Sequence, residues 1–212
     1  RLLPMFGDHP LPTAGDVCQL LAKIYYEWND LANAQVYGQK SLELTHLYDK
    51  VIDRFILSEV FLARLELAQG EPENASARLS RIAQSARQPH FIHRLPDVAE
   101  AQVAILLKQG QAAKTEKLAS KFNLPLSPVR VLLALGNPSA ALARLEPLRQ
   151  RAENRNWPDE RLKIMVLQAL AFQAGGANQQ ASQVLSEALA LAEPGGFIRL
   201  FVDEGENMRS LL

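Results

Sequence analysis

Five turn residues recur along this chain at a nearly regular spacing, and this pattern limits the possible folds more than any other feature. Each is followed, five positions later, by a small residue that starts an apolar run. The pairs lie 41, 40, 26 and 40 positions apart and are Asn29/Ala34, Gly70/Ala75, Gly110/Thr115, Gly136/Ala141 and Gly176/Ala181. A period in this range is typical of stacked helical hairpins, which bury their apolar faces only against their neighbours.

The spacing predicts an all-α fold, a right-handed superhelix of about five antiparallel helix hairpins with a period of about 40 residues. Thr13 or Asp16 is expected to cap the first helix, whose core stripe is predicted to be Val17, Leu20, Leu21, Ile24 and Tyr25. The expected helix pairs are about 13–28 and 31–48, about 49–69 and 72–87, a pair opening at Asp97 and turning at Gly110, about 128–135 and 138–154, and about 158–174 and 178–193.

We expect residues 1–212 to form a single helical-repeat domain that is part of a longer protein. Residues 1–12 hold three prolines and a glycine and are predicted to be a loop leading into the first helix. Residues 194–212 are predicted to start a further helical layer. With 48% hydrophobic and 22% charged residues, the chain can bury a sizeable core.

Charge and hydropathy argue against two classes of partner. The 23 basic and 23 acidic residues cancel, whereas nucleic-acid binding relies on clustered Lys and Arg. No apolar run approaches the roughly 20 residues that cross a bilayer. The single cysteine, Cys18, lies in an apolar helical pattern, so we expect a buried thiol and a cytoplasmic protein.

The small residues also recur within each hairpin. An alanine in the first helix precedes the small residue of the second by 12 positions, at Ala22/Ala34, Ala63/Ala75 and Ala169/Ala181. This offset resembles the tetratricopeptide repeat, in which small residues let two antiparallel helices touch. The period of about 40 is longer than the 34 residues of that repeat.

Two stretches narrow the resemblance, namely YEWNDLANA at 26–34 and GFIRLFVDEG at 196–205. They resemble the "YExNDLxxA" and "GxxRxFxDEG" segments of the MalT-like large ATP-binding regulators of the LuxR class, where both lie in a helical-repeat sensor domain. The resemblance implies an N-terminal ATPase and a C-terminal helix-turn-helix in the full-length protein. No G-x-x-x-x-G-K-[ST] motif occurs in this chain, so we expect ATP and DNA to bind elsewhere.

The function that this resemblance implies is effector sensing or protein interaction for transcription regulation. We expect the concave face to bind a small-molecule inducer or a regulatory protein and to control self-association of the full-length protein. We expect no enzymatic activity, cofactor or metal in the chain itself. The alternative is a free-standing peptide-binding scaffold of the tetratricopeptide type.

In stacked hairpins the first helices line the concave face, which places the candidate binding residues. Tyr26 is expected to offer a flat wall, and Lys23 and Arg64 to bind a carboxylate or phosphate oxygen. Ordinary surface positions are the alternative for any one of them. The predicted set is Gln19, Lys23, Tyr26, Glu27, Arg64, Asp97 and Glu100.

Three further groups have a chemical interpretation and a simpler one. His90 and His93 have a spacing that a metal could use, but two ligands make a poor zinc site, so we expect loop histidines. The acids Asp203, Glu204 and Glu206 could act as paired carboxylates, yet a solvated turn is the expectation. Trp28 and Trp157 are expected to anchor helix ends in the core rather than stack on a ligand.

Overall fold

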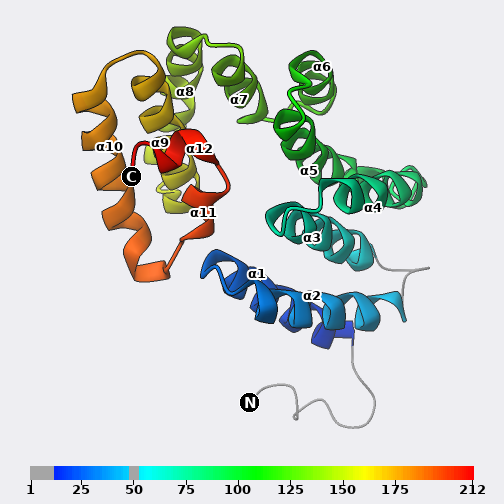
Figure 1. Cartoon of the computed structure of the whole chain (residues 1–212). Helices are drawn as coiled ribbons and strands as arrows, with labels where there is room; N and C mark the ends of the chain where they lie inside the picture. Colours follow the sequence, from blue (N-terminus) through cyan, green and yellow to red (C-terminus); the bar gives the residue numbers. More distant parts are fainter. Residues whose placement is uncertain (1–11, 48–52) are drawn as a thin grey trace. The chain divides into compact units, whose positions relative to one another are not determined.

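The structure is a computed structural model that describes residues 12–47 and 53–212, and its regular elements are helices (Figure 1). Within those ranges no residue belongs to a β-strand. Consecutive helices pack on one another along most of the chain. The predicted all-α repeat of antiparallel helices is therefore confirmed.

The chain divides into two compact units, Arg1–Ile105 and Leu106–Leu212. Each has an apolar core of its own: the first is centred on residues such as Ile56, Leu62 and Leu65, and the second on Leu145, Ile164 and Leu167. The single continuous domain stays a prediction.

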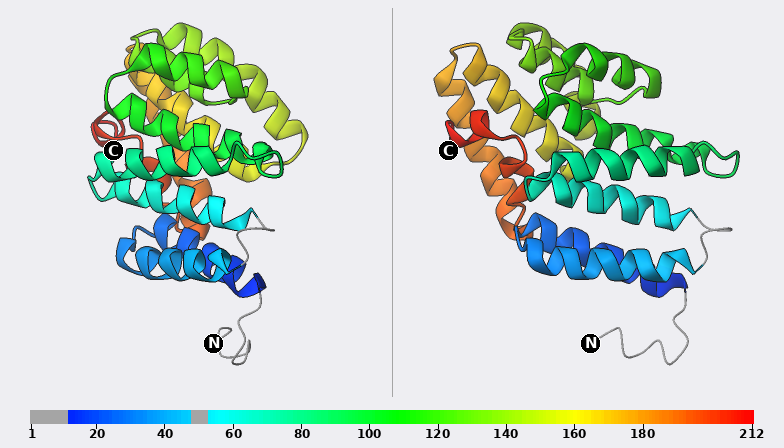
Figure 2. Two further views of the ribbon diagram at one scale, coloured as in Figure 1. Left: turned by 90° about the vertical axis from the view of Figure 1, so that its right-hand side faces the viewer. Right: turned by 45° about the vertical axis from the view of Figure 1, so that its right-hand side comes forward.

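Unit 1 contains two complete helical hairpins and the start of a third (Figure 2). Helix α1 packs on α2, α2 on α3, and α3 on α4. Val98 and Ile105 of the fifth helix belong to the same core. The elements are α1 (Pro12–Glu27), α2 (Leu31–His46), α3 (Arg54–Ala68), α4 (Pro72–Ser85), the 3-10 helix η2 (Ile92–Arg94) and α5 (Leu95–Lys108).

Unit 2 continues the pattern, with α6 on α7, α7 on α8, α8 on α9 and α9 on α10. Helix α7 has only eight residues, which explains the short spacing of 26 between Gly110 and Gly136. The elements are α6 (Ala112–Phe122), α7 (Ser127–Ala134), α8 (Pro138–Asn154), α9 (Pro158–Ala174), α10 (Asn178–Ala192), the 3-10 helix η3 (Glu193–Gly195), α11 (Arg199–Val202) and α12 (Glu206–Arg209).

The five predicted turns have one common geometry. Their turn residues all adopt left-handed backbone angles, with φ between the 61° of Asn29 and the 86° of Gly70. The following N–H bonds a carbonyl five residues back, as in Asp30 N to Tyr25 O at 2.9 Å, which closes the helix end. The five small residues after these turns are all 0% exposed, at Ala34, Ala75, Thr115, Ala141 and Ala181.

The same turn occurs at two asparagines that the sequence analysis did not single out. Asn123 ends α6 with φ 52° and Asn156 follows α8 with φ 50°. Asparagine tolerates this conformation better than other residues with a side chain, so both positions carry a physical signal. Glycine indicates a left-handed turn more strongly than asparagine does. The spacing of turn residues alone therefore did not predict the turns at these two asparagines.

The start of the chain differs from the prediction in two respects. Pro12 already belongs to α1, and the rest of the predicted loop, residues 1–11, lies outside the described residues. Thr13 and Asp16 lie inside α1 and do not cap it, so that prediction is wrong. Asp16 instead forms an ion pair with Arg54 of α3 at 2.9 Å.

The predicted core stripe of α1 is also wrong in part. The apolar side chains that α1 buries are Ala14, Cys18, Ala22 and Tyr26, whereas Leu20 is 61% and Ile24 is 43% exposed. The small side chains at 14, 18 and 22 let α1 approach its neighbours closely, so they form its contact face. The burial of Cys18 is as predicted.

The last 16 residues fold onto the core of unit 2. Two single-turn helices, α11 and α12, bury Phe201 and Met208 in that core. Helix α11 contacts α9 (Figure 1). The tail is therefore part of the unit.

Candidate functional site

Two of the predicted binding residues lie in the core of unit 1. Tyr26 is 2% and Gln19 is 8% exposed. The Gln19 amide donates to the Leu57 carbonyl at 3.3 Å and its oxygen accepts from the Ser41 hydroxyl at 3.2 Å. Tyr26 packs edge-on against Phe61 with ring centroids 5.9 Å apart. Neither side chain forms an open wall, so that part of the expectation is corrected.

Three other predicted residues reach the surface close together on α1 and α3. The Arg64 guanidinium lies 4.8 Å from the centroid of the Tyr26 ring and 4.0 Å from the Glu27 carboxylate. Lys23 is exposed one helical turn before Glu27. We call Lys23, Glu27 and Arg64 the α1–α3 polar cluster. It combines two cations with one carboxylate above a buried aromatic ring.

Asp97 belongs to a different cluster of charged side chains, which includes Asp53 at the N-terminal end of α3. Asp97 lies 3.4 Å from Arg94, and the Asp53 carboxylate accepts from Arg94 Nε at 2.5 Å and pairs with His93 Nε2 at 2.5 Å. Arg64 lies roughly 16 Å further along α3, from the rise of 1.5 Å per residue. Asp97 is therefore not part of the α1–α3 polar cluster, and whether it binds a ligand stays a prediction.

Glu100 is exposed on α5, close to Asp97 in sequence. Its predicted role in ligand binding likewise stays a prediction.

Burial and ion pairing have opposite effects on the pKa of the Asp53 carboxyl. Burial by itself raises the pKa of the Asp53 carboxyl, but the hydrogen bonds from Arg94 and His93 outweigh it and hold the pKa below the ordinary value. His93 is thus held by a carboxylate. Within residues 12–47 and 53–212, no group of three or more His, Cys, Asp or Glu could hold a metal ion.

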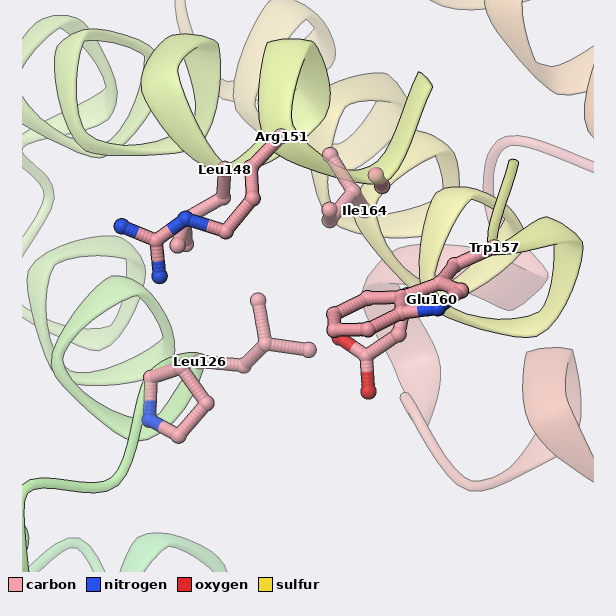
Figure 3. Close-up of a pocket in the computed structure, with 8 residues that line it drawn as sticks. Leu126, Leu148, Arg151, Trp157, Glu160 and Ile164 are labelled. Atoms are coloured by element: carbon pink, nitrogen blue, oxygen red, sulfur yellow. The ribbon is translucent and has the colours of Figure 1, made fainter. Parts of the chain in front are cut away.

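Unit 2 contains a pocket of about 210 Å³ between the start of α7, α8 and the start of α9 (Figure 3). Leucine and isoleucine side chains form much of its surface. The charged side chains of Arg151 and Glu160 lie on opposite sides of Leu126 in the close-up. The lining residues are Pro125, Leu126, Leu148, Arg151, Ala152, Trp157, Glu160 and Ile164.

Trp157 is held at the edge of this pocket by the turn that precedes α9. Asn156 adopts the left-handed conformation, and the Trp157 N–H then donates to the Ala152 carbonyl at 2.9 Å. Arg155 lies 4.8 Å from the centroid of the indole ring. An indole held in this way can offer a flat apolar surface to a ligand.

The expectation that both tryptophans are anchored in the core is wrong. Trp157 is 45% and Trp28 is 50% exposed. Trp28 packs edge-on against Tyr25, which stacks on Tyr37 with centroids 5.4 Å apart. The sequence signal that was missed is the run Asn156-Trp157-Pro158, because a proline opening α9 places the indole at the helix junction.

The acids near the C-terminal end are mostly paired. Glu204 accepts hydrogen bonds from Arg130 of α7, and Asp203 pairs with Arg199 of α11. Glu206 forms an exposed ion pair with Arg209 at 3.6 Å, and with its side chain 80% exposed it is a solvated acid as expected. The solvated-turn prediction is therefore wrong for the other two. Their partners give them a structural role.

The comparison with known families is decisive for the identity of this fold. The family described as "MalT-like TPR region" matches residues 1–212. The chain belongs to this family. The buried alanines at the 12-residue offset and the repeated left-handed turns are the structural counterparts of that repeat class.

The MalT-like TPR chain is also similar to curated proteins described as "HTH-type transcriptional regulator MalT". It is 27% identical over 216 residues to that of Cronobacter sakazakii, which covers 95% of this chain and 24% of the relative. The identity is 23% over 218 residues for Yersinia enterocolitica, with 95% and 24% covered. It is 21% over 209 residues for Vibrio campbellii, with 92% and 23% covered.

The chain spans about a quarter of the length of these relatives. Among the helices of the described residues, none is long and apolar enough to span a membrane.

Proposed function

We propose that this MalT-like TPR chain is the effector-sensing and protein-interaction part of a cytoplasmic, ATP-dependent transcriptional regulator. It binds a small-molecule inducer or a regulatory protein, and the full-length protein couples this binding to self-association and to DNA-dependent transcription. The family membership and the relatives named as transcriptional regulators support this proposal. ATP and DNA contacts are assigned to segments outside these 212 residues.

The main observation that supports a binding site is the Arg64 guanidinium, which its neighbours hold in a fixed position. The Tyr26 ring lies beneath it and Glu27 lies beside it, while its own side chain stays 48% exposed. A guanidinium held between an aromatic face and a carboxylate loses little freedom on binding, which favours bidentate recognition of oxyanions. With Lys23 one turn away, the cluster fits a small polar ligand that carries a carboxylate or phosphate.

Regulation requires more than binding. A ligand shifts a protein between two states only to the extent that it binds one of them better. In the proposal, the inducer binds the form competent for self-association more tightly than the autoinhibited monomer. The chain takes part as a binding surface, and no catalytic step is assigned to it.

The alternative function is a free-standing peptide-binding scaffold, and the pocket beside Trp157 is the feature that favours it. An apolar side chain of a peptide fits against Leu126, Leu148 and the indole. Arg151 and Glu160, on opposite sides of Leu126, could pair with charges flanking that side chain (Figure 3). The two functions thus assign the ligand to different surfaces.

Thermal-shift screening of the purified protein separates the two functions. A metabolite that raises the melting temperature of the wild-type protein but not of Arg64→Ala supports the sensor proposal. A shift by peptides alone, lost in Trp157→Ala and retained in Arg64→Ala, supports the scaffold. Metabolite binding that is insensitive to Arg64→Ala contradicts the proposed site.

A further inference from the structure

Helix α1 has apolar side chains on two opposite faces. One face packs Ala14, Cys18, Ala22 and Tyr26 into the core of unit 1. The other carries Leu20 and Ile24, which are 61% and 43% exposed, and it is continued by Trp28 in the turn after the helix, which is 50% exposed. A helix that is apolar on both sides is typical of the interior of a helical assembly.

The positions of Leu20 and Ile24, unlike that of Trp28, are buried in the repeats inside the chain. If Ala22, Ala63 and Ala169 are aligned, the partners of Leu20 are Phe61 in α3 and Leu167 in α9. Phe61 is 5% and Leu167 is 0% exposed. The partners of Ile24 are Leu65 and Ala171, and both are 0% exposed.

The helix that precedes each of these two hairpins packs on the first helix of that hairpin. Helix α2 packs on α3, and α8 packs on α9. The approach of α2 is close, because a Cβ added to Gly38 would lie 2.9 Å from the Phe61 ring. The exposed face of α1 is thus the equivalent of a surface that the chain covers with a helix in both of these repeats.

We propose that in the full-length regulator a further α-helix covers the face of α1 formed by Leu20 and Ile24. This helix belongs to the same polypeptide and packs on α1 as α2 packs on α3. The α2–α3 and α8–α9 interfaces support a helix of the same polypeptide, because in each of them the covering helix comes from the adjacent hairpin. The relatives are about four times as long as this chain, which leaves ample sequence for such a helix.

The covering helix is expected to have a defined arrangement of apolar and polar residues. Its face toward α1 is apolar, with a small residue opposite Leu20 where α2 has Gly38 opposite Phe61. Its flank near Lys23 and Glu27 is polar, because these two residues border the apolar face of α1. Arg64, the residue on which the sensing proposal depends, lies on α3, so the covering helix can be tested independently of ligand binding.

Cysteine labelling of the full-length regulator tests the inference. Leu20→Cys and Ile24→Cys are each treated with a maleimide, and the modified peptide is quantified by mass spectrometry. Val36→Cys is the matched control, since Val36 is 61% exposed and its equivalents in later repeats, Ala77 and Gln183, are also exposed. The native thiol of Cys18 is 0% exposed and adds little background.

The expected result is labelling at positions 20 and 24 about tenfold slower or more than at position 36, in the monomeric protein. Equal rates at the three positions would overturn the inference. Protection that disappears when the protein is diluted from dimer to monomer would also overturn it, and would assign the face to a second copy. Circular dichroism of each variant confirms that slow labelling is measured on folded protein.

Discussion

The guanidinium of Arg130 in α7 donates to the carboxylate of Glu204, which lies 74 positions later in the chain. The Nη2–Oε1 distance is 2.5 Å and the Nε–Oε1 distance is 3.2 Å. The two side chains are 28% and 12% exposed. This ion pair joins the C-terminal segment of unit 2 to α7, while Phe201 and Met208 join it to the core.

Glu204→Gln is expected to lower the free energy of unfolding by about 1.5–3 kcal/mol, the usual range for a hydrogen bond to a charged group. Urea unfolding followed by circular dichroism measures the change. Glu206→Gln is the matched control, because its side chain is 80% exposed, and it should change the stability little. Equal effects of the two substitutions would show that the Arg130 pair does not stabilise the fold.

Asp53 should make the stability depend on pH in the acid range. Because its folded-state pKa is held below the ordinary value of 3.8, its contribution is present above that value and is lost as the pH falls through the lower pKa of the folded state. Unfolding free energies measured between pH 5 and the lowest pH at which the protein folds should fall less steeply in Asp53→Asn than in the wild-type protein. A wild-type slope in Asp53→Asn would contradict the prediction.

The left-handed turns should tolerate glycine and asparagine better than alanine. At Gly70 a Cβ would meet nothing within 4 Å, so Gly70→Ala tests backbone strain alone. The strain of roughly 1–2 kcal/mol is partly offset by the reduced entropy of the unfolded chain, which leaves a loss of about 1 kcal/mol. Gly70→Asn should cost less, and Asn29→Gly should cost nothing measurable. Thermal unfolding of the three variants is the measurement, and a stabilising Gly70→Ala would refute the turn assignment.

Cys18 should be inert in the folded protein. Burial raises the pKa of its thiol, and the reactive thiolate is therefore disfavoured. A thiol reagent such as 5,5′-dithiobis(2-nitrobenzoate) should react with it at a measurable rate only after denaturant is added. Rapid reaction under native conditions would show that α1 opens readily from α2.

Much of the fold was predictable because local signals agree with one another. Glycine or asparagine at each turn, and a small residue five positions later, predict helix ends and helix contacts together. The spacing also located the second helix of each hairpin, as at Ala34 and Ala181. These effects act between residues close in sequence, so they can be predicted from the local sequence alone.

The candidate site was less predictable because burial depends on the neighbouring helices. The apolar stripe of α1 predicted a core face, yet the small residues Cys18 and Ala22 are the ones fully buried, and Leu20 is exposed. Tyr26 was placed on a ligand face and lies beneath Arg64 instead. The pocket beside Trp157 forms from three segments that span 39 positions, from Pro125 to Ile164, and no local pattern brings them together.

The most direct test of the sensing proposal is isothermal titration calorimetry with the inducer identified by screening. Replacement of Arg64 by alanine should weaken binding by about 1.5–3 kcal/mol, or roughly 10- to 150-fold, because a charged hydrogen bond is lost while the half-exposed position leaves the fold intact. Arg209→Ala, at an 82% exposed arginine of α12, should bind as the wild-type protein does. Unchanged affinity in Arg64→Ala, together with loss of binding in Trp157→Ala, would contradict the account and assign the ligand to the pocket of unit 2.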